Sequence, residues 1–175
     1  MLVGQKNFGV LDQILLYLRI KLNFMLKELT KSVKEKRKQI LDFEATLLSM
    51  KDQDNVYLGD DHKHPLTHVF TEGLYLRELR LEAGTTIVGK IHKEDHIVFL
   101  LHGIVAVATD TGVQEYKGPC YIESKAGVKR VAHAVTDIIW VNIHANPTNT
   151  QNLEELENNI IAKNYLEYEE FKKLK

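Results

Sequence analysis

Short segments of strand-forming residues dominate the chain between residues 56 and 145. Each segment is rich in valine, isoleucine or aromatic residues, and turn signals such as Asp110-Thr111-Gly112 separate them. The segments are GLYLRELRL, TTIVGKIH, HIVFLLHG, IVAVATD, YIES, RVAHAV and DIIWVNIH. Strands that recur about every 8–12 residues without an intervening helix predict an antiparallel β-sandwich or barrel.

The residues before this region predict a long helix over residues 12–50. Asp12 suits the N-cap, and no proline or glycine follows it before residue 50. Apolar residues recur along one side of the helix at spacings of three and four, as a helix–helix partner requires. This seam consists of Leu22, Leu26, Leu29, Val33, Ile40, Phe43, Leu47 and Met50. Because a continuous helix would extend roughly 57 Å, we expect it to pair with a second copy; the alternative is that it folds back onto its own domain.

The last part of the chain, residues 150–174, predicts a helical tail without recognisable chemistry. Thr150 or Asn149 suits the N-cap, and the apolar stripe consists of Leu153, Leu156, Ile160 and Ile161. We expect the tail to pack against the β region or the N-terminal helix. The chain therefore divides into a helical arm for oligomerisation or docking (1–55), a β-barrel (56–147) and a C-terminal helical tail (148–175).

Charge and cysteine content exclude several classes of partner. The net charge of −1 gives no general attraction to nucleic acid or acidic membranes. The basic stretch KSVKEKRKQ has no interleaved aromatic residues, so we interpret it as a solvated helix face.

The apolar run over residues 10–26 contains Asp12, Arg19 and Lys21 and makes a poor membrane span. The single Cys120 excludes an intramolecular disulfide and fits a reducing compartment, so we predict a cytoplasmic protein.

Two histidines four residues apart, His92 and His96, are the strongest candidates for metal ligands. His92 ends one predicted strand and His96 begins the next, across the tight turn KED, so adjacent strands can direct both rings to one point. By the two-residue period of a strand, His96 shares a face with Val98 and Leu100. A histidine on an apolar face is more often a hydrogen-bonded core residue, so the pair by itself leaves a structural role open.

The stretch GTTIVGKIHKEDHIVFLLHG resembles the first motif of the cupin superfamily. Gly84 opens the motif and Gly103 closes it. His92 matches its second histidine, and His96 stands where the motif has a glutamate. Lys90 occupies the place of the first histidine, which is a departure from the family pattern.

The stretch GPCYIESKAGVKRVAH is similar to the second cupin motif. Gly118 matches the opening glycine, and the position of the motif histidine falls on Lys129 or Arg130. The resemblance covers about residues 66–145. It implies a mainly β fold, a cupin-type jelly roll or β-barrel, with a long N-terminal helix and a C-terminal helical tail added here. It also implies a bound divalent transition metal ion.

A closer likeness is to small uncharacterised cupin-like proteins encoded by tailed phages. It rests on PLTHVFTEGLYLRELRLEAGTTIVGKIHK, GPCYIESKAGVKRVAH and DIIWVNIH. This resemblance implies a phage-encoded protein in the host cytoplasm or in the virion, with other phage structural proteins as partners. It brings no assigned activity.

The candidate metal ligands are His92, His96, His133 and His144. His133 alternates with Val131 and Val135, as residues on an inward face would, and His144 ends the segment DIIWVNIH. His68 is a reserve candidate. Imidazole nitrogens suit zinc, iron, manganese or nickel, and the choice among them stays open.

Basic residues at expected ligand positions allow a different ligand. A pocket lined by Lys90, Arg77 or Arg130 and neutral imidazoles would suit a carboxylate or phosphate through charge-assisted hydrogen bonds. Each of these residues taken alone is better interpreted as a surface cation paired with a neighbouring carboxylate.

Two functions of different classes follow from this pattern. The favoured hypothesis is a metal-stabilised binding or assembly module, a phage accessory or virion component, because two of four expected ligand positions depart from the motifs. The alternative is a small metal-dependent enzyme, an oxygenase, isomerase or lyase acting on a small anionic metabolite, and no catalytic residue is assigned. An open, solvent-connected cavity around His92 with a perturbed carboxylate or lysine nearby would favour the enzyme, whereas a barrel filled with apolar side chains would favour the module.

Overall fold

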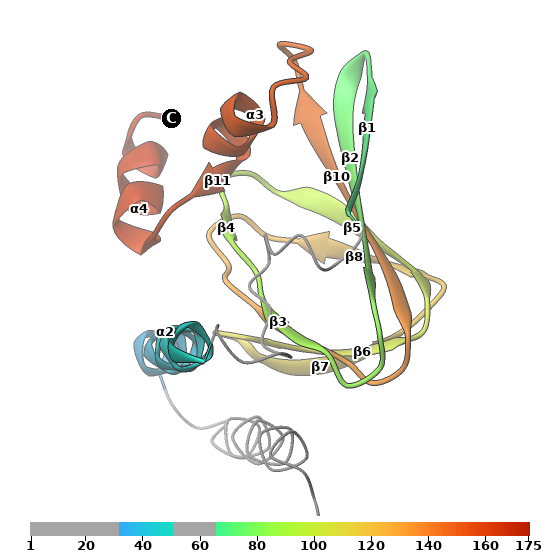
Figure 1. Ribbon diagram of the computed structural model, residues 1–175. Coiled ribbons are helices and arrows are strands. Elements are labelled where there is room, and N and C mark those ends of the chain that lie inside the picture. The colour runs from blue at the N-terminus through green and yellow to red at the C-terminus, as the bar shows by residue number, and fades with distance from the viewer. Residues whose placement is uncertain (1–31, 51–65) are drawn as a thin grey trace, which may run out of the picture.

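The computed structural model describes residues 32–50 and 66–175, which form two antiparallel β-sheets flanked by helices (Figure 1). The larger sheet contains, in order, β1 (Leu66–Thr71), β2 (Gly73–Leu81), β10 (Ile138–Asn146), β5 (His96–His102) and β8 (Cys120–Ser124). The smaller sheet contains β3 (Thr86–Val88), β9 (Val131–Ala134), β6 (Ile104–Thr109) and β7 (Gly112–Lys117). A two-stranded ladder joins β4 (Ile91–His92) to β11 (Ile161–Ala162). The helices are α2 (Val33–Ser49), α3 (Leu153–Ile160) and α4 (Tyr165–Lys173), and no helix in these described ranges is long and apolar enough to cross a membrane.

The strand order identifies the architecture as a jelly roll. In the larger sheet β2, β10, β5 and β8 are successive neighbours, and in the smaller sheet β3, β9, β6 and β7 are. The chain therefore passes from one sheet to the other at most connections, and the hairpin from β6 to β7 is an exception. Without the edge strand β1, each sheet has four strands, and two four-stranded sheets connected in this way form the double-sheet jelly roll that cupins share. The predicted fold class, a mainly β cupin-type jelly roll with helices before and after it, is confirmed.

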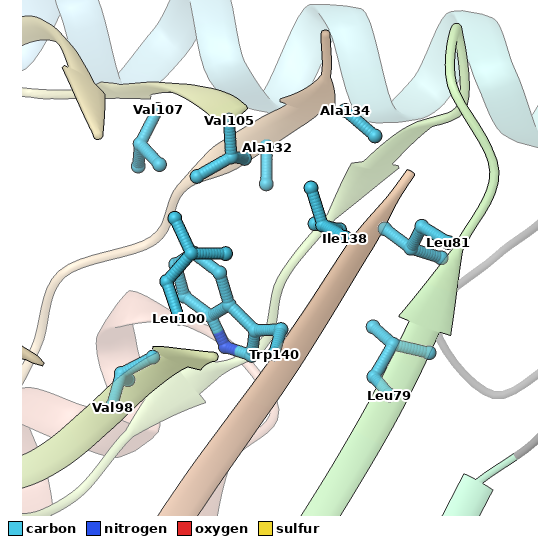
Figure 2. Close-up of a cluster of buried hydrophobic side chains, with 10 residues drawn as sticks. All are labelled: Leu79, Leu81, Val98, Leu100, Val105, Val107, Ala132, Ala134, Ile138 and Trp140. Carbon is cyan, nitrogen blue, oxygen red and sulfur yellow. The ribbon is translucent and has the colours of Figure 1, made fainter. Parts of the chain in front are cut away.

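The space between the sheets holds an apolar core (Figure 2). Its buried members are Leu79, Leu81, Val98, Leu100, Val105, Val107, Ala132, Ala134, Ile138 and Trp140. The indole of Trp140 lies next to Leu100 in the middle of this cluster (Figure 2). The Trp140 Nε1–H donates to Oδ1 of Asn142 over 3.2 Å, which marks where the interior changes from apolar to polar.

Helix α2 begins at Val33 because Ser32 caps it. Ser32 has extended backbone angles, and its hydroxyl accepts a hydrogen bond from the backbone N–H of Glu35. In return the Glu35 carboxylate accepts a hydrogen bond from the Ser32 backbone N–H over 2.8 Å. This capping box satisfies donors that a helix start leaves unpaired. A single uninterrupted helix over residues 12–50 is therefore wrong, and the predicted helical segment over residues 12–31 lies outside the described residues.

The apolar face of α2 packs on the smaller sheet of its own chain (Figure 1). Three residues of the predicted seam, Ile40, Phe43 and Leu47, are buried at this contact. Their buried partners are Val88, Ala108 and Val131. For this part of the arm the alternative of folding back onto the domain is the one observed. Self-association through the N-terminal arm stays a prediction.

Replacing Leu47 with alanine tests how much this docking contributes to stability. Leu47 is 2% exposed, so Leu47→Ala should lower the free energy of unfolding by about 2–5 kcal/mol through the cavity it leaves. Its neighbour Leu48 is 44% exposed, so Leu48→Ala is a matched control that should cost less than about 1 kcal/mol. Urea denaturation of both variants measures the difference. Equal losses would contradict the docking of α2 on the barrel.

The C-terminal tail folds as two short helices with a strand between them. Asn152 caps α3 and Asn164 caps α4, each through a side-chain oxygen that accepts backbone N–H bonds. Between the helices, Ile161 of β11 pairs with His92 of β4, and Ile161 and Ala162 are buried. The predicted helical tail is therefore confirmed as two short helices, which a strand interrupts because Ile161 and Ala162 complete a ladder on the barrel. The prediction that the tail packs against the β region is confirmed.

Candidate metal centre

The register of the larger sheet brings His96 and His144 next to each other on its inner face. Ile97 of β5 lies opposite Ile143 of β10 in the antiparallel ladder. The residue before Ile97 and the residue after Ile143 are therefore neighbours. Both histidines are 6% exposed. Buried and exposed residues alternate along β5 with His96 on the buried side, so its predicted inward face is confirmed.

His92 approaches the same place from β4. Its carbonyl oxygen accepts a hydrogen bond from the Gly127 N–H over 2.9 Å, and Ile161 of the tail pairs with it on the other side. The next residue, Lys93, donates its backbone N–H to the Ile160 carbonyl oxygen over 2.8 Å. The tail, to which the sequence analysis assigned no chemistry, therefore holds a candidate ligand in position.

The three imidazole rings form a compact group. The ring centroids of His92 and His96 are 4.1 Å apart, those of His96 and His144 4.4 Å, and those of His92 and His144 4.9 Å. One potential donor atom from each ring lies within 4.8 Å of the other two. Within residues 32–50 and 66–175, this is the group of three or more His, Cys, Asp or Glu side chains that is arranged closely enough to hold an ion.

Burial keeps these imidazoles in the neutral form. Burial lowers the pKa of His96 to about 4, and the charge of Arg130 adds to the effect. Burial lowers the pKa of His144 to about 3, with a further contribution from His96. The pKa of His92 is also well below its usual value, through burial and then the neighbouring His96 and His144. Neutral imidazole is the form that offers a lone pair to a metal ion.

Two ring nitrogens of the group have no hydrogen-bond partner among the described residues. They are Nδ1 of His92 and Nε2 of His96, and both are buried. A buried polar atom without a partner costs about 1–3 kcal/mol, so such atoms call for a ligand. Three neutral imidazoles, two of them with an unsatisfied ring nitrogen, are a donor set that divalent transition metals accept. The residues present therefore fit a metal ion.

Tyr75 lies behind this group on the inner face of the larger sheet. It pairs with His144 in the β2–β10 ladder, and the centroids of the two rings are 6.1 Å apart. Its hydroxyl oxygen lies 2.7 Å from Nδ1 of His68, so the reserve candidate His68 is engaged with Tyr75 and is not part of the three-histidine group. The sequence analysis did not single out Tyr75, although its alternation with Arg77 along β2 is the signal that could have found it.

His133 lies apart from the three-histidine group. Its Nδ1 is 2.8 Å from Oγ1 of Thr86, on the neighbouring strand β3 of the smaller sheet. The sequence analysis placed His133 and Val131 on the inward face, but Ala132 and Ala134 belong to the core between the sheets, and Val131 packs under α2. The predicted face of β9 was therefore wrong. Because α2 covers the outer face, both faces of this strand carry buried apolar residues, and alternation cannot tell them apart.

A cavity of about 70 Å³ adjoins His92. Its polar lining consists of Arg77, Lys90, His92, Arg130 and Asn142, and its apolar lining includes Leu79, Ile138 and Trp140. The interior of the jelly roll is thus an apolar core with a cationic cavity beside the histidines. A cavity and an apolar filling are both present, and the core residues Leu79, Ile138 and Trp140 form part of the cavity wall.

The two basic residues at the motif positions have different surroundings. Lys90, in the place of the first motif histidine, extends to the tail, where its Nζ lies 2.5 Å from Oε1 of Glu157. Lys90 is thus paired with a carboxylate, but with one from the C-terminal tail and not with a neighbour such as Glu78 or Asp137. Arg130, at the position of the second-motif histidine, is partly buried, and its Nη2 donates to Oγ of the buried Ser124 over 2.6 Å.

No protein-family model matches this chain, and no curated protein sequence matches it. Among solved structures, a cupin family protein from Methanocaldococcus jannaschii has 14% sequence identity and a TM-score of 0.42, over 53% of this chain and 89% of that one. A cupin domain from Bordetella pertussis has 18% identity and a TM-score of 0.39, over 47% of this chain and 93% of that one.

A larger protein is similar at the same level. The salicylate 1,2-dioxygenase of Pseudoaminobacter salicylatoxidans, crystallised with gentisate, has 14% identity and a TM-score of 0.47, over 66% of this chain and 32% of that one. At such low identities and TM-scores, these likenesses carry no argument about activity. The fold assignment rests on the strand order, which is that of a cupin-type jelly roll. Inside this fold, three histidines form a group suited to a metal ion.

Proposed function

We propose that this protein binds a divalent transition metal ion through His92, His96 and His144 and presents it to a small molecule in the adjoining cavity. The observation that carries the proposal is the pair of buried, unpartnered nitrogens, Nδ1 of His92 and Nε2 of His96, within a group of neutral imidazoles. Three protein ligands are typical of metal sites that keep a position open for water or substrate. A bound ion would supply Lewis-acid polarisation of an oxygen atom on that molecule.

The cavity supports the small-molecule function over the assembly module that the sequence favoured. It adjoins His92 and carries the side chains of Arg77, Arg130 and Asn142, which could bind and orient a polar ligand. In this proposal the chain is a small metal-dependent enzyme acting on an anionic metabolite, with an oxygenase, isomerase or lyase as the reaction class. Zinc, iron, manganese and nickel all suit the donor set.

A second candidate function, the assembly module, is supported by apolar side chains on the outer face of the larger sheet. Ile97, Phe99 and Leu101 of β5 are 37–50% exposed, and Tyr121, which pairs with Phe99, is 74% exposed. A row of exposed apolar residues on a sheet suits contact with another protein. The phage origin suggested by the sequence resemblance belongs to this candidate and stays a prediction.

Elemental analysis of freshly purified protein tests the metal site. Wild type should contain about one equivalent of a transition metal, and the variants His92→Ala/His96→Ala and His144→Ala should contain less than about a tenth of that. His133→Ala is the matched control, because His133 lies outside the group, and it should keep its metal. A folded wild type that stays metal-free after incubation with each of the four metals would contradict the proposal, as would an equal loss in His133→Ala.

Light scattering on the same samples tests self-association. An oligomer that persists in the metal-free variants would support the assembly module as a role independent of the metal site. A monomer would contradict self-association through the N-terminal arm and leave contact with a different protein as the remaining form of the assembly module.

A further inference from the structure

The cavity beside the histidines is lined by cations and has no acidic lining residue among the described residues. Arg77, Lys90 and Arg130 all contribute to its wall. Cavities that bind neutral or cationic molecules in proteins normally offer carboxylates or neutral polar groups, because like charges repel at short range. The composition of this wall therefore points to a negatively charged occupant.

Arg130 is the residue on which the inference rests. Its guanidinium donates to the hydroxyl of Ser124 over 2.6 Å, and it forms no ion pair with an Asp or Glu within the parts of the chain that the structure describes. This residue is partly buried, and burial lowers the pKa of its guanidinium. A cation held away from water without a counter-ion is costly unless a ligand supplies the negative charge.

The lysines around the same site provide the contrast. Lys90 pairs with Glu157 over 2.5 Å, Lys93 with Glu167 over 3.6 Å, and Lys129 with Glu44 over 2.7 Å. These cations are balanced within the protein, in keeping with structural roles. Arg130 differs from these lysines, because it has no carboxylate partner among the described residues and donates to the hydroxyl of Ser124 instead.

The backbone around Arg130 leaves room for its side chain at this point. The Gly89 N–H donates to the Arg130 carbonyl oxygen over 2.8 Å, which brings β3 and β9 together. A Cβ atom at Gly89 would lie 3.3 Å from Cγ of Arg130, a tight approach. In addition, Ser124 pairs with His96 in the β8–β5 ladder. The hydroxyl that binds Arg130 is therefore on the strand position next to a candidate metal ligand.

We propose that the cavity binds a small oxyanion through the guanidinium of Arg130, and that this anion and the metal ion strengthen each other's binding. This inference rests on the proposed metal site. A divalent cation held by three neutral imidazoles next to Arg130 and Arg77 would concentrate positive charge, and an anion between them would offset it. Coulomb attraction between opposite charges held close together favours the binding of each in the presence of the other. Because such coupling is reciprocal, the metal must raise the affinity for the anion by the same factor.

The volume of the cavity limits the size of this anion. At roughly 10–15 Å³ for each water-sized occupant, about 70 Å³ holds on the order of five non-hydrogen atoms. Acetate and inorganic phosphate are within this limit, and both have oxygen atoms spaced to accept the paired N–H groups of a guanidinium. A short carboxylate and a free phosphate are therefore the two sources of the same chemistry.

Calorimetric titration with acetate and with phosphate tests the proposal, on metal-free protein and on protein loaded with one equivalent of Co²⁺. At constant ionic strength, one of the anions should bind saturably to the Co²⁺-loaded wild type and at least fivefold more weakly to the metal-free protein. Arg130→Gln should weaken this binding at least tenfold. Lys90→Gln, the matched control, removes a cation that Glu157 already balances and should change it less than about threefold. Arg130→Lys keeps the charge without the planar fork and should fall between wild type and Arg130→Gln.

The outcomes separate this inference from the metal proposal. Acetate binding identifies a carboxylate ligand, and phosphate binding identifies a phosphate ligand. Absence of saturable binding of either anion overturns the inference, and so does an equal loss in Arg130→Gln and Lys90→Gln. If wild type retains no Co²⁺, the metal site and the coupling both fail, whereas Arg130-dependent binding to the metal-free protein still supports the anion site. Circular dichroism of each variant identifies misfolding, in which case Arg130→Lys decides.

Discussion

Metal-free protein is expected to lose stability steeply as the pH falls from 6.5 towards 4. In the unfolded chain a histidine titrates near its usual pKa of about 6.5. In the folded chain burial holds the pKa of His96 at about 4 and that of His144 at about 3, and it lowers the pKa of His92 as well. Between these pKa values the unfolded state binds protons that the folded state does not. The contribution of the neutral histidines to stability is therefore fully present above pH 6.5 and is lost as the pH falls.

The expected loss is comparable to the whole stability of a domain. His96 and His144 each contribute about 1.4 kcal/mol for each pH unit below 6.5, so the two together contribute on the order of 3 kcal/mol for each unit, and His92 adds to the loss in the same direction. By pH 5 the loss from His96 and His144 reaches roughly 4 kcal/mol, against a total of about 5–15 kcal/mol for ordinary proteins. Urea midpoints measured at pH 7, 6 and 5 in the presence of EDTA give the slope.

A pair of substitutions assigns this slope to the buried imidazoles. His144→Gln removes one of the three titrating groups and should reduce the slope by about a third. His102 is exposed at the end of β5, so His102→Gln should leave the slope unchanged. If the stability of metal-free wild type does not change between pH 7 and pH 5, the three imidazoles are not buried in the neutral form.

Alternation and turn signals were sufficient to predict most strands of the two sheets and to select His92 and His96 as candidate ligands. The segment predicted over residues 73–81 coincides with β2, and His96 occupies the buried face that the period of β5 assigns to it. Strands with one apolar and one polar face identify their own orientation. The strand β7 was not predicted, because its residues GVQEYK are largely exposed and polar, and its place is set by pairing with β6.

The rest of the candidate site depends on contacts between segments that are distant in the sequence. His144 becomes a neighbour of His96 only through the register of β10 against β5, which no local pattern encodes. His133 was misplaced because α2 covers the outer face of β9. In the sequence, Arg130 is only a departure from a motif. Its contact with Ser124 and its place in the cavity wall are visible only in the structure.

Removing the carboxylate of Glu44 is expected to destabilise the protein by about 2–4 kcal/mol. Glu44 lies on α2, and its Oε1 is 2.7 Å from Nζ of Lys129, whose side chain is 7% exposed. Glu44→Ala leaves that ammonium buried without its partner, and breaking a buried pair from one side typically costs about 3–5 kcal/mol. The side chain of Glu44 is itself 28% exposed, so water entering in its place reduces the cost somewhat.

Comparison of the single variant with a double variant tests whether the unpaired, buried ammonium of Lys129 causes the loss of stability. Glu44→Ala/Lys129→Met removes both charges and should recover most of the stability lost in Glu44→Ala, because no charge then remains away from water. Asp42→Ala, which breaks the exposed pair of Asp42 with Lys38 on the same helix, is the matched control and should cost about 0.5 kcal/mol or less. Urea denaturation of the three variants measures these differences. If the double variant is no more stable than Glu44→Ala, the buried ammonium is not the cause of the loss. The apolar contacts of α2 and the ion pair of Arg37 with Asp110 then hold the helix on the barrel.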